Sequence, residues 1–162
     1  IEPFESVLEI GSNVGPNLAL IKDIYTTAKI MGVDINIDAI VCGMKNLPKA
    51  YFLRCPIEKL DFISYEAFDV VICDAVLLYV EDIKNTMENI GIIAKKAIIL
   101  CEWKSKEKDE EILYGHWARN YRKYIELYTR LKVEEEIKIT EEFWPNPKWS
   151  ELGHIWLAKK YR

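Results

Sequence analysis

The sequence lacks the features that mark several protein classes. It has no apolar run long enough to span a membrane and no secretion signal at its start, so we expect a cytoplasmic protein that does not contact membranes. It also lacks an excess of positive charge, because 26 acidic residues outnumber 22 basic ones and give a net charge of -4. This balance argues against a large nucleic-acid interface.

Cysteine is scarce, and its spacing excludes the common metal motifs. The four cysteines form no C-x-x-C pair, and no cluster of histidine and cysteine accompanies them. We therefore predict no structural zinc site and no other bound metal. Three of the four cysteines lie in apolar segments, which favours buried, reduced thiols.

The 162 residues, half of them hydrophobic, fit one domain over residues 1–162. Short apolar runs alternate with helical patterns, and this alternation predicts an α/β fold with a doubly wound, mostly parallel sheet. The expected strands are 7–10, 29–35, 50–54, 67–73 and 97–101, and the expected helices between them are 17–28, 37–44 and 81–93.

The last third of the chain has a different pattern. Apolar residues recur at steps of three and four over residues 107–131, which predicts one long amphipathic helix. Strands are expected at 135–140 and 154–159 with only a loop between them, as in an antiparallel hairpin at the edge of the sheet. Arg119 and Arg122 are predicted to lie on a solvated helix face, with contact to an acidic substrate as the alternative.

Residues 7–18 form the most informative segment. An apolar strand reaches Glu9, and a turn with Gly11 and Gly15 leads to Pro16, which suits the first turn of a helix. Such a loop lets a ligand approach bare backbone. Glu9 adds a carboxylate that can accept hydrogen bonds from a ligand amine, which a pyrophosphate site has no reason to supply. A dinucleotide site is the alternative, although its G-x-G-x-x-G fingerprint is absent.

Polar groups also follow the other predicted strands, whose carboxyl ends meet at one edge of a parallel sheet. Asp34 ends the second strand, where an acid can hold a ribose diol. Its alternative role is to cap the next helix, for which Asn36 is also available. Asp74 ends the fourth strand, either as a site residue or as a capping acid.

In combination, these segments resemble the class I S-adenosylmethionine-dependent methyltransferases. Residues 9–15 resemble motif I, with Asn13 in place of its middle glycine, residues 32–36 resemble the ribose-binding motif, and residues 68–79 resemble the fourth-strand motif. Asn tolerates unusual backbone angles, so the exchange is compatible with the loop. The resemblance implies a Rossmann-like seven-stranded sheet of order 3-2-1-4-5-7-6, in which the helix that usually precedes the first strand is missing or truncated.

The resemblance also implies a cofactor, S-adenosylmethionine, which becomes S-adenosylhomocysteine. Glu9 and the backbone around Gly11 would hold its methionine part, Asp34 would accept its ribose hydroxyls, and the segment after Arg54 would meet its adenine. The predicted cofactor-binding residues are Glu9, Gly11, Ser12, Asn13, Gly15, Asp34, Ile35, Cys55, Ile57, Asp74, Ala75 and Tyr79.

The acceptor is predicted to be a small molecule. Residues 13–18 and 114–121 together resemble methylases linked to surface-sugar biosynthesis, which suggests a sugar derivative. His116 is the candidate general base, with a surface helix residue as the alternative interpretation. Residues 144–149 form either a lid or pocket wall, or an exposed connection. A non-catalytic protein that binds the cofactor or acts as a scaffold is the alternative function.

Overall fold

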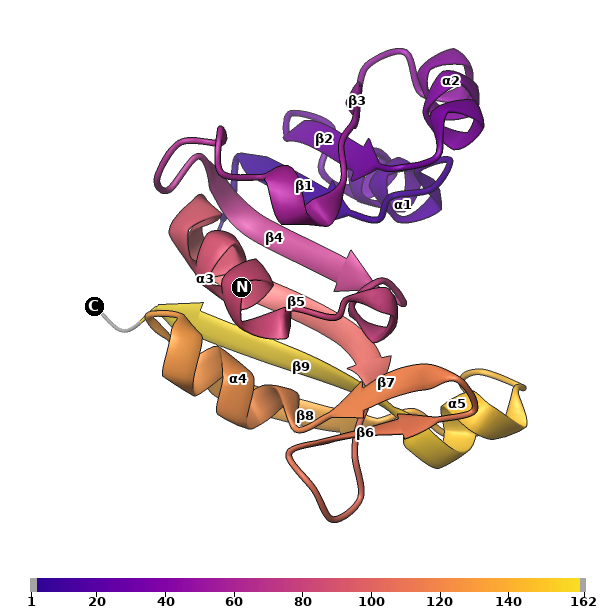
Figure 1. Cartoon of the computed structure of the whole chain (residues 1–162). Helices are drawn as coiled ribbons and strands as arrows, with labels where there is room; N and C mark the ends of the chain where they lie inside the picture. Colours follow the sequence, from indigo (N-terminus) through magenta and orange to yellow (C-terminus); the bar gives the residue numbers. More distant parts are fainter. Residues whose placement is uncertain (1–2, 161–162) are drawn as a thin grey trace.

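The computed structural model describes residues 3–160, and within this range seven strands form one sheet in the order β3-β2-β1-β4-β5-β9-β8 (Figure 1). This order confirms the prediction from the family resemblance. The strands from β1 to β5 run parallel, whereas β9 is antiparallel to both β5 and β8. The strands are β1 (Ser6–Ile10), β2 (Lys29–Asp34), β3 (Tyr51–Arg54), β4 (Phe68–Asp74), β5 (Ala94–Trp103), β8 (Leu131–Lys138) and β9 (Gly153–Lys160).

Helices cover both faces of the sheet. Alternate residues of a strand point to opposite faces, so Val7 of β1 packs with Leu18 of α1, whereas Leu8 packs in the cluster that contains Ile90 of α3. None of the helices within residues 3–160 is long and apolar enough to cross a membrane. The helices are α1 (Pro16–Ile24) and α2 (Ile37–Asn46) on one face, and α3 (Ile83–Ile93) and α4 (Tyr121–Tyr128) on the other.

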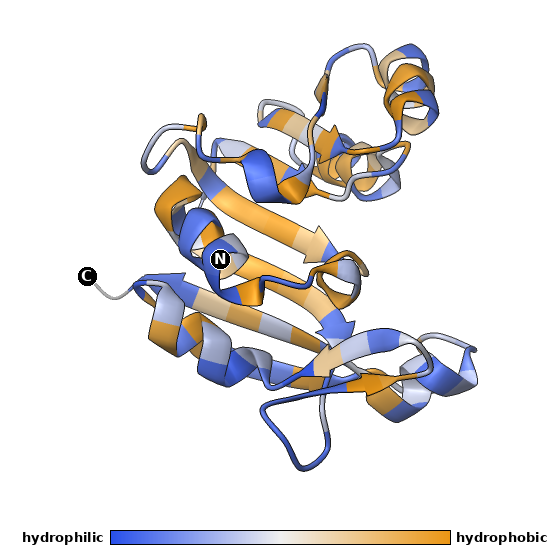
Figure 2. Cartoon of the chain, in the orientation of Figure 1, coloured by the Kyte–Doolittle hydropathy of each residue, from blue (hydrophilic) through white to orange (hydrophobic). Residues whose placement is uncertain are grey.

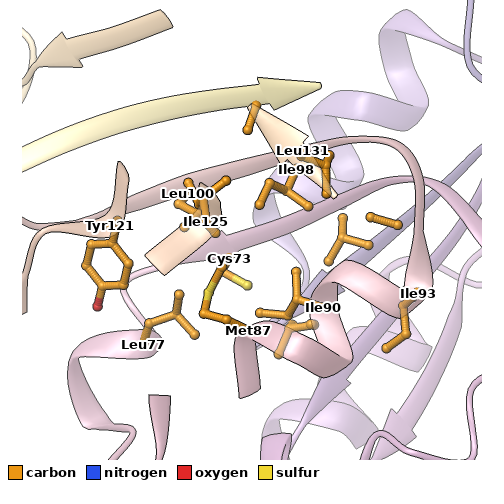
Figure 3. Packing of buried hydrophobic residues seen from close by; sticks show 14 of the residues in the cluster. Cys73, Leu77, Met87, Ile90, Ile93, Ile98, Leu100, Tyr121, Ile125 and Leu131 are labelled. Atoms are coloured by element: carbon orange, nitrogen blue, oxygen red, sulfur yellow. The ribbon is translucent and has the colours of Figure 1, made fainter. Parts of the chain in front are cut away.

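The largest core lies between the sheet and the α3–α4 layer. Figure 2 shows β4 as hydrophobic over most of its length, as expected for a strand buried on both faces. In Figure 3, Met87 and Ile90 of α3 and Ile125 of α4 converge on Cys73 and Ile98 from the sheet. All four cysteines are unpaired, and Cys73 is among the buried ones.

The predicted helix over residues 107–131 is wrong. The segment instead forms a second, two-stranded sheet of β6 (Glu110–Leu113) and β7 (His116–Arg119), followed by the short helix α4. Tyr114 and Gly115 both have positive φ angles, 51° and 83°, and so form a tight turn that a helix cannot contain. The side chain of Asn120 then accepts a hydrogen bond from the Lys123 amide and starts α4.

The connection between the two antiparallel strands also differs from the prediction. A short helix, α5 (Pro147–Leu152), lies between β8 and β9 where only a loop was expected. Asn146 caps it by accepting hydrogen bonds from the Lys148 and Trp149 amides, and Pro147 occupies its first turn. Residues 145–148 are exposed, whereas Trp144 is half-buried and Trp149 is only 8% exposed.

Truncation of Ile98 tests the packing of the main core. Its side chain is fully buried, so Ile98→Ala removes apolar contacts and leaves a cavity. We expect the free energy of unfolding in urea to fall by about 2–5 kcal/mol. Ile137→Ala, at a position that is 55% exposed, is the control and should change that value by less than about 0.5 kcal/mol. Equal losses in both variants would contradict this description of the core.

Candidate functional site

A cavity of about 640 Å³ opens where the carboxyl ends of β1, β2 and β4 meet. Ligands bind at this edge in open parallel sheets. All of the predicted cofactor-binding residues except Gly15 line the cavity, and Trp144, from the β8–β9 connection, joins them. Pro56, in the segment expected to meet the adenine, lines it as well, and so do residues that the sequence did not assign to the cofactor, namely Ile10, Pro16, Asn17, Asn36, Glu58, Val76, Val80 and Trp144.

The glycine loop is held against the end of β2. The amides of Gly11 and Ser12 both donate to the Val33 carbonyl oxygen, at 2.8 and 3.0 Å. Gly11 has a φ angle of 73°, and a Cβ atom there would lie 2.6 Å from the Cβ of Val76, so only glycine fits. Asn13 adopts a φ angle of 49°, in the left-handed region that asparagine tolerates better than most residues other than glycine.

Gly15 serves the fold and does not line the cavity. Its φ angle of 81° turns the chain into α1, for which it is the N-cap residue. A Cβ atom at Gly15 would lie 2.8 Å from the ring of Phe52, a core residue of β3. The glycine is therefore required by the turn and by packing between the loop and β3.

Asp34 uses its carboxylate to join the glycine loop to the end of β2. One oxygen accepts the Asn13 amide and the other accepts the Asn36 amide, each at 2.8 Å. Asn36, and not Asp34, caps α2 through hydrogen bonds from the Asp38 and Ala39 amides. A carboxylate offers about four lone-pair sites, so both Asp34 oxygens can accept a further hydrogen bond from a ligand.

Asn17 joins two acidic strand ends. Its amide nitrogen donates to the carboxylates of Glu9, at 2.8 Å, and of Asp74, at 2.9 Å. Sequence reasoning missed this role of Asn17, because the bond to Asp74 spans 57 positions. The carboxylates of Glu9 and Asp74 therefore lie close to each other in the lining of the cavity.

Glu9 is the more deeply buried of these acids, at 2% exposed. Burial raises the pKa of its carboxyl to about 7, with a smaller contribution from the charge of Asp74, and the hydrogen bond from Asn17 offsets this only in part. A positive ligand group placed beside Glu9 would favour its ionised form.

Aromatic side chains form the side of the cavity near β7. Tyr79 and Trp144 line it, and the Tyr79 ring is 68% exposed. His116 does not line the cavity; its ring packs edge-on against Tyr79 and Trp103, with centroids 4.9 and 5.6 Å apart. Trp103 is buried in the core behind these rings.

Arg119 and Arg122, which were both expected on a solvated helix face, lie in different environments. Arg119 is fully buried, so its predicted place on a solvated face is wrong. The reason is that β7 packs over the loop after β4, whose carbonyl groups Arg119 binds. Arg122 is 43% exposed in its side chain and pairs with Glu126 and Glu136, as expected for a solvated position.

Residues 8–98, more than half of the chain, match the family model described as a methyltransferase domain. This chain belongs to the methyltransferase domain family. No curated protein matches the sequence.

Solved structures support the same fold at low sequence identity. An S-adenosylmethionine-dependent methyltransferase from Mesorhizobium loti aligns with a TM-score of 0.77 and 12% identity over 96% of this chain and 90% of that one. The magnesium protoporphyrin IX methyltransferase of Synechocystis, with bound S-adenosylhomocysteine, gives 0.74 and 13% over 96% and 74%. The 1,6-didemethyltoxoflavin-N1-methyltransferase of Burkholderia thailandensis gives 0.75 and 13% over 99% and 72%.

S-adenosylmethionine is the cofactor that the family and these structures support, which confirms that prediction. The cavity of this methyltransferase domain fits such a group. Within residues 3–160, one buried oxygen each of Glu9, Ser12 and Asp74 makes no hydrogen bond. Buried polar atoms normally have a partner, and the ammonium group of the cofactor is a suitable donor for carboxylate oxygens.

Replacement of Glu9 should alter stability in a pH-dependent way. Because the folded pKa of about 7 exceeds the ordinary 4.5, ionisation of Glu9 costs the folded state stability as pH rises from 4.5 to 7. Glu9→Gln removes this cost, so its free energy of unfolding relative to wild type should rise by roughly 2 to 3 kcal/mol between pH 5 and pH 8. Urea unfolding without ligand at both pH values measures this.

Glu142→Gln is the matched control for the Glu9 variant, because Glu142 is exposed and its replacement makes the same change in net charge. Its stability relative to wild type should not change between the two pH values. A Glu9→Gln variant that shows no gain at pH 8 would mean that Glu9 is ionised without penalty in the folded protein.

Proposed function

We propose that this methyltransferase domain transfers the methyl group of S-adenosylmethionine to a small-molecule acceptor. The observation that carries the proposal is the convergence of Glu9, Ser12 and Asp74, each with an unsatisfied buried oxygen, in the cavity that Asp34 also lines. Acids at two separate strand ends suit one elongated ligand with an ammonium group at one end and a ribose at the other.

Each end of the cofactor has candidate partners. We assign its ammonium group to Glu9 and Asp74, which Asn17 holds together, and its ribose hydroxyls to Asp34. Ile35 and Ile57 offer apolar contacts to adenine on the far side of Asp34, where Glu58 also lines the cavity and can accept a hydrogen bond from the adenine amine. Asn13 and Ala75, with positive φ angles, bring backbone close to the ligand.

The bound cofactor supplies an electrophilic methyl group on a positively charged sulfur. The role of the protein is to hold donor and acceptor in line and to exclude water, which lowers the entropic part of the barrier. The acids that line the cavity also favour a cationic ligand over an anionic one. His116 stays our candidate general base: it does not line the cavity itself, and its ring packs against Tyr79, which does.

The acceptor is proposed to be a small molecule without negative charge, and a sugar derivative is our candidate. No lysine, arginine or histidine is found among the described residues that line the cavity, so nothing there pairs with an anionic acceptor. Tyr79 and Trp144 offer aromatic rings on which the apolar face of a sugar or another ring can pack. The non-catalytic alternative is not favoured, because the chain belongs to a family of methyltransferase domains.

Calorimetric titration with S-adenosylmethionine and S-adenosylhomocysteine tests the proposal. Wild type should bind both, and Asp34→Asn should bind both about 10- to 100-fold more weakly, since it loses charged hydrogen bonds to the ribose. Asp38→Asn, in the exposed first turn of α2, makes the same chemical change away from the cavity and should bind as wild type does. Absence of binding to wild type, or competition by NAD, would refute the proposal.

A further inference from the structure

The cavity has a wall made by the segment that follows β4. We define this wall segment as residues 75–81, which include the short 3-10 helix η2 (Leu77–Tyr79). Ala75, Val76, Tyr79 and Val80 of the wall segment line the cavity. The wall segment also packs directly against the glycine loop, because a Cβ atom added at Gly11 would lie only 2.6 Å from the Cβ atom of Val76. Any shift of the wall segment therefore reaches the methionine end of the proposed cofactor site.

Glu102, near the end of β5, holds the amide groups of the wall segment. One carboxylate oxygen accepts the amides of Val76 and Leu77, at 2.9 and 2.8 Å, and the other accepts the Leu78 amide at 3.2 Å. Glu102 is completely buried. Burial raises the pKa of this carboxyl to about 8, although the three amides oppose that rise.

Arg119, from β7, holds the carbonyl groups of the same segment. Its guanidinium donates to the carbonyl oxygens of Leu77 at 3.0 Å and Val80 at 2.7 Å, and it also reaches Glu81 at 3.4 Å. Arg119 is completely buried, stacks on the Trp117 ring at 4.6 Å, and pairs with Glu110, whose side chain is 42% exposed.

A buried carboxyl group and a buried guanidinium are an expensive way to satisfy the backbone of a short loop. A loop over solvent can donate and accept hydrogen bonds with water, whereas a buried ion costs several kcal/mol of desolvation. The wall segment lies against the protein interior, because the Leu77 side chain enters the main core near Tyr121 (Figure 3). Protein groups therefore take the place of water as hydrogen-bond partners for this part of its backbone. Glu102 binds the amides and Arg119 binds the carbonyl groups of the wall segment, while its other face stays open to the cavity.

We propose that Glu102 and Arg119 are positioning residues for the cofactor, which hold the wall segment where it meets the methionine part of the ligand. This inference rests on the proposed function. Neither side chain lines the cavity, so any effect on the ligand passes through Val76, Tyr79 and their neighbours. The adenosine part of the ligand, at Asp34, lies on the other side of the glycine loop and should not depend on this pair of residues.

The test compares two ligands that share an adenosine part. S-adenosylhomocysteine and adenosine are titrated into wild type, Glu102→Gln and Arg119→Lys, at a temperature where circular dichroism shows all of them folded. Each variant should bind S-adenosylhomocysteine about tenfold more weakly, the effect of about one hydrogen bond, and should bind adenosine as wild type does. Glu110→Gln, which removes only the exposed partner of Arg119, should bind both ligands as wild type does.

The outcomes separate this inference from the proposed function. If wild type binds S-adenosylhomocysteine and both variants bind it equally well, or lose affinity for adenosine to the same extent, the positioning role is refuted and the proposed function stands. If wild type binds neither ligand, the proposed function itself fails, and the positioning role with it.

Hydrogen exchange in the unmodified protein gives a test that does not require the variants to fold. The amides of Val76, Leu77 and Leu78 should be protected without ligand to a degree similar to the amides of β4, because buried Glu102 binds them. Exchange as fast as in an exposed loop would overturn the inference.

Discussion

The site depends on placing three carboxyl groups, those of Glu9, Asp74 and Glu102, close together in a largely buried part of the fold. Glu9, Asp74 and Glu102 lie at or near the carboxyl ends of the adjacent strands β1, β4 and β5. Burial, with a smaller contribution from the charge of Asp74, disfavours ionisation of Glu9 and Glu102, and the folded chain offsets this in part with the Asn17 amide and with the backbone amides that Glu102 binds. The glycine loop, α1 and the wall segment are arranged around these hydrogen bonds.

This arrangement links ligand recognition to the stability of the empty protein. Glu9 is buried beside Asp74 with part of its hydrogen-bonding capacity unused, which costs free energy until a positive group arrives. A residue that weakens the fold can thus strengthen binding, and binding in turn stabilises the folded state. Gly15 and Asp34 show the opposite relation, because Gly15 packs on Phe52 and Asp34 binds the loop backbone, so both residues support the fold.

Strand alternation and glycine turns, which are local patterns, predicted the parallel half of the sheet, and the family resemblance implied the full strand order and nearly all of the proposed cofactor residues. The prediction failed where local patterns are ambiguous. The apolar recurrence over residues 107–131 fits a helix, and only Gly115 and Asn120 signalled a turn and a new helix start. The roles of Asn17 and Glu102 could not be inferred, because Asp74 lies 57 positions from Asn17 and Val76 lies 26 positions from Glu102.

The chain order of the antiparallel strands has a consequence for synthesis. Within residues 3–160, β8 pairs only with β9, and β9 lies between β8 and β5. During synthesis β8 leaves the ribosome before β9, so β8 has no partner strand until residues 153–160 follow. Because β9 is also the strand that pairs with β5, β5 stays an open edge of the sheet during that interval. The parallel half of the protein can assemble early, whereas the antiparallel half closes in a single late step that a stalled or prematurely terminated chain never reaches.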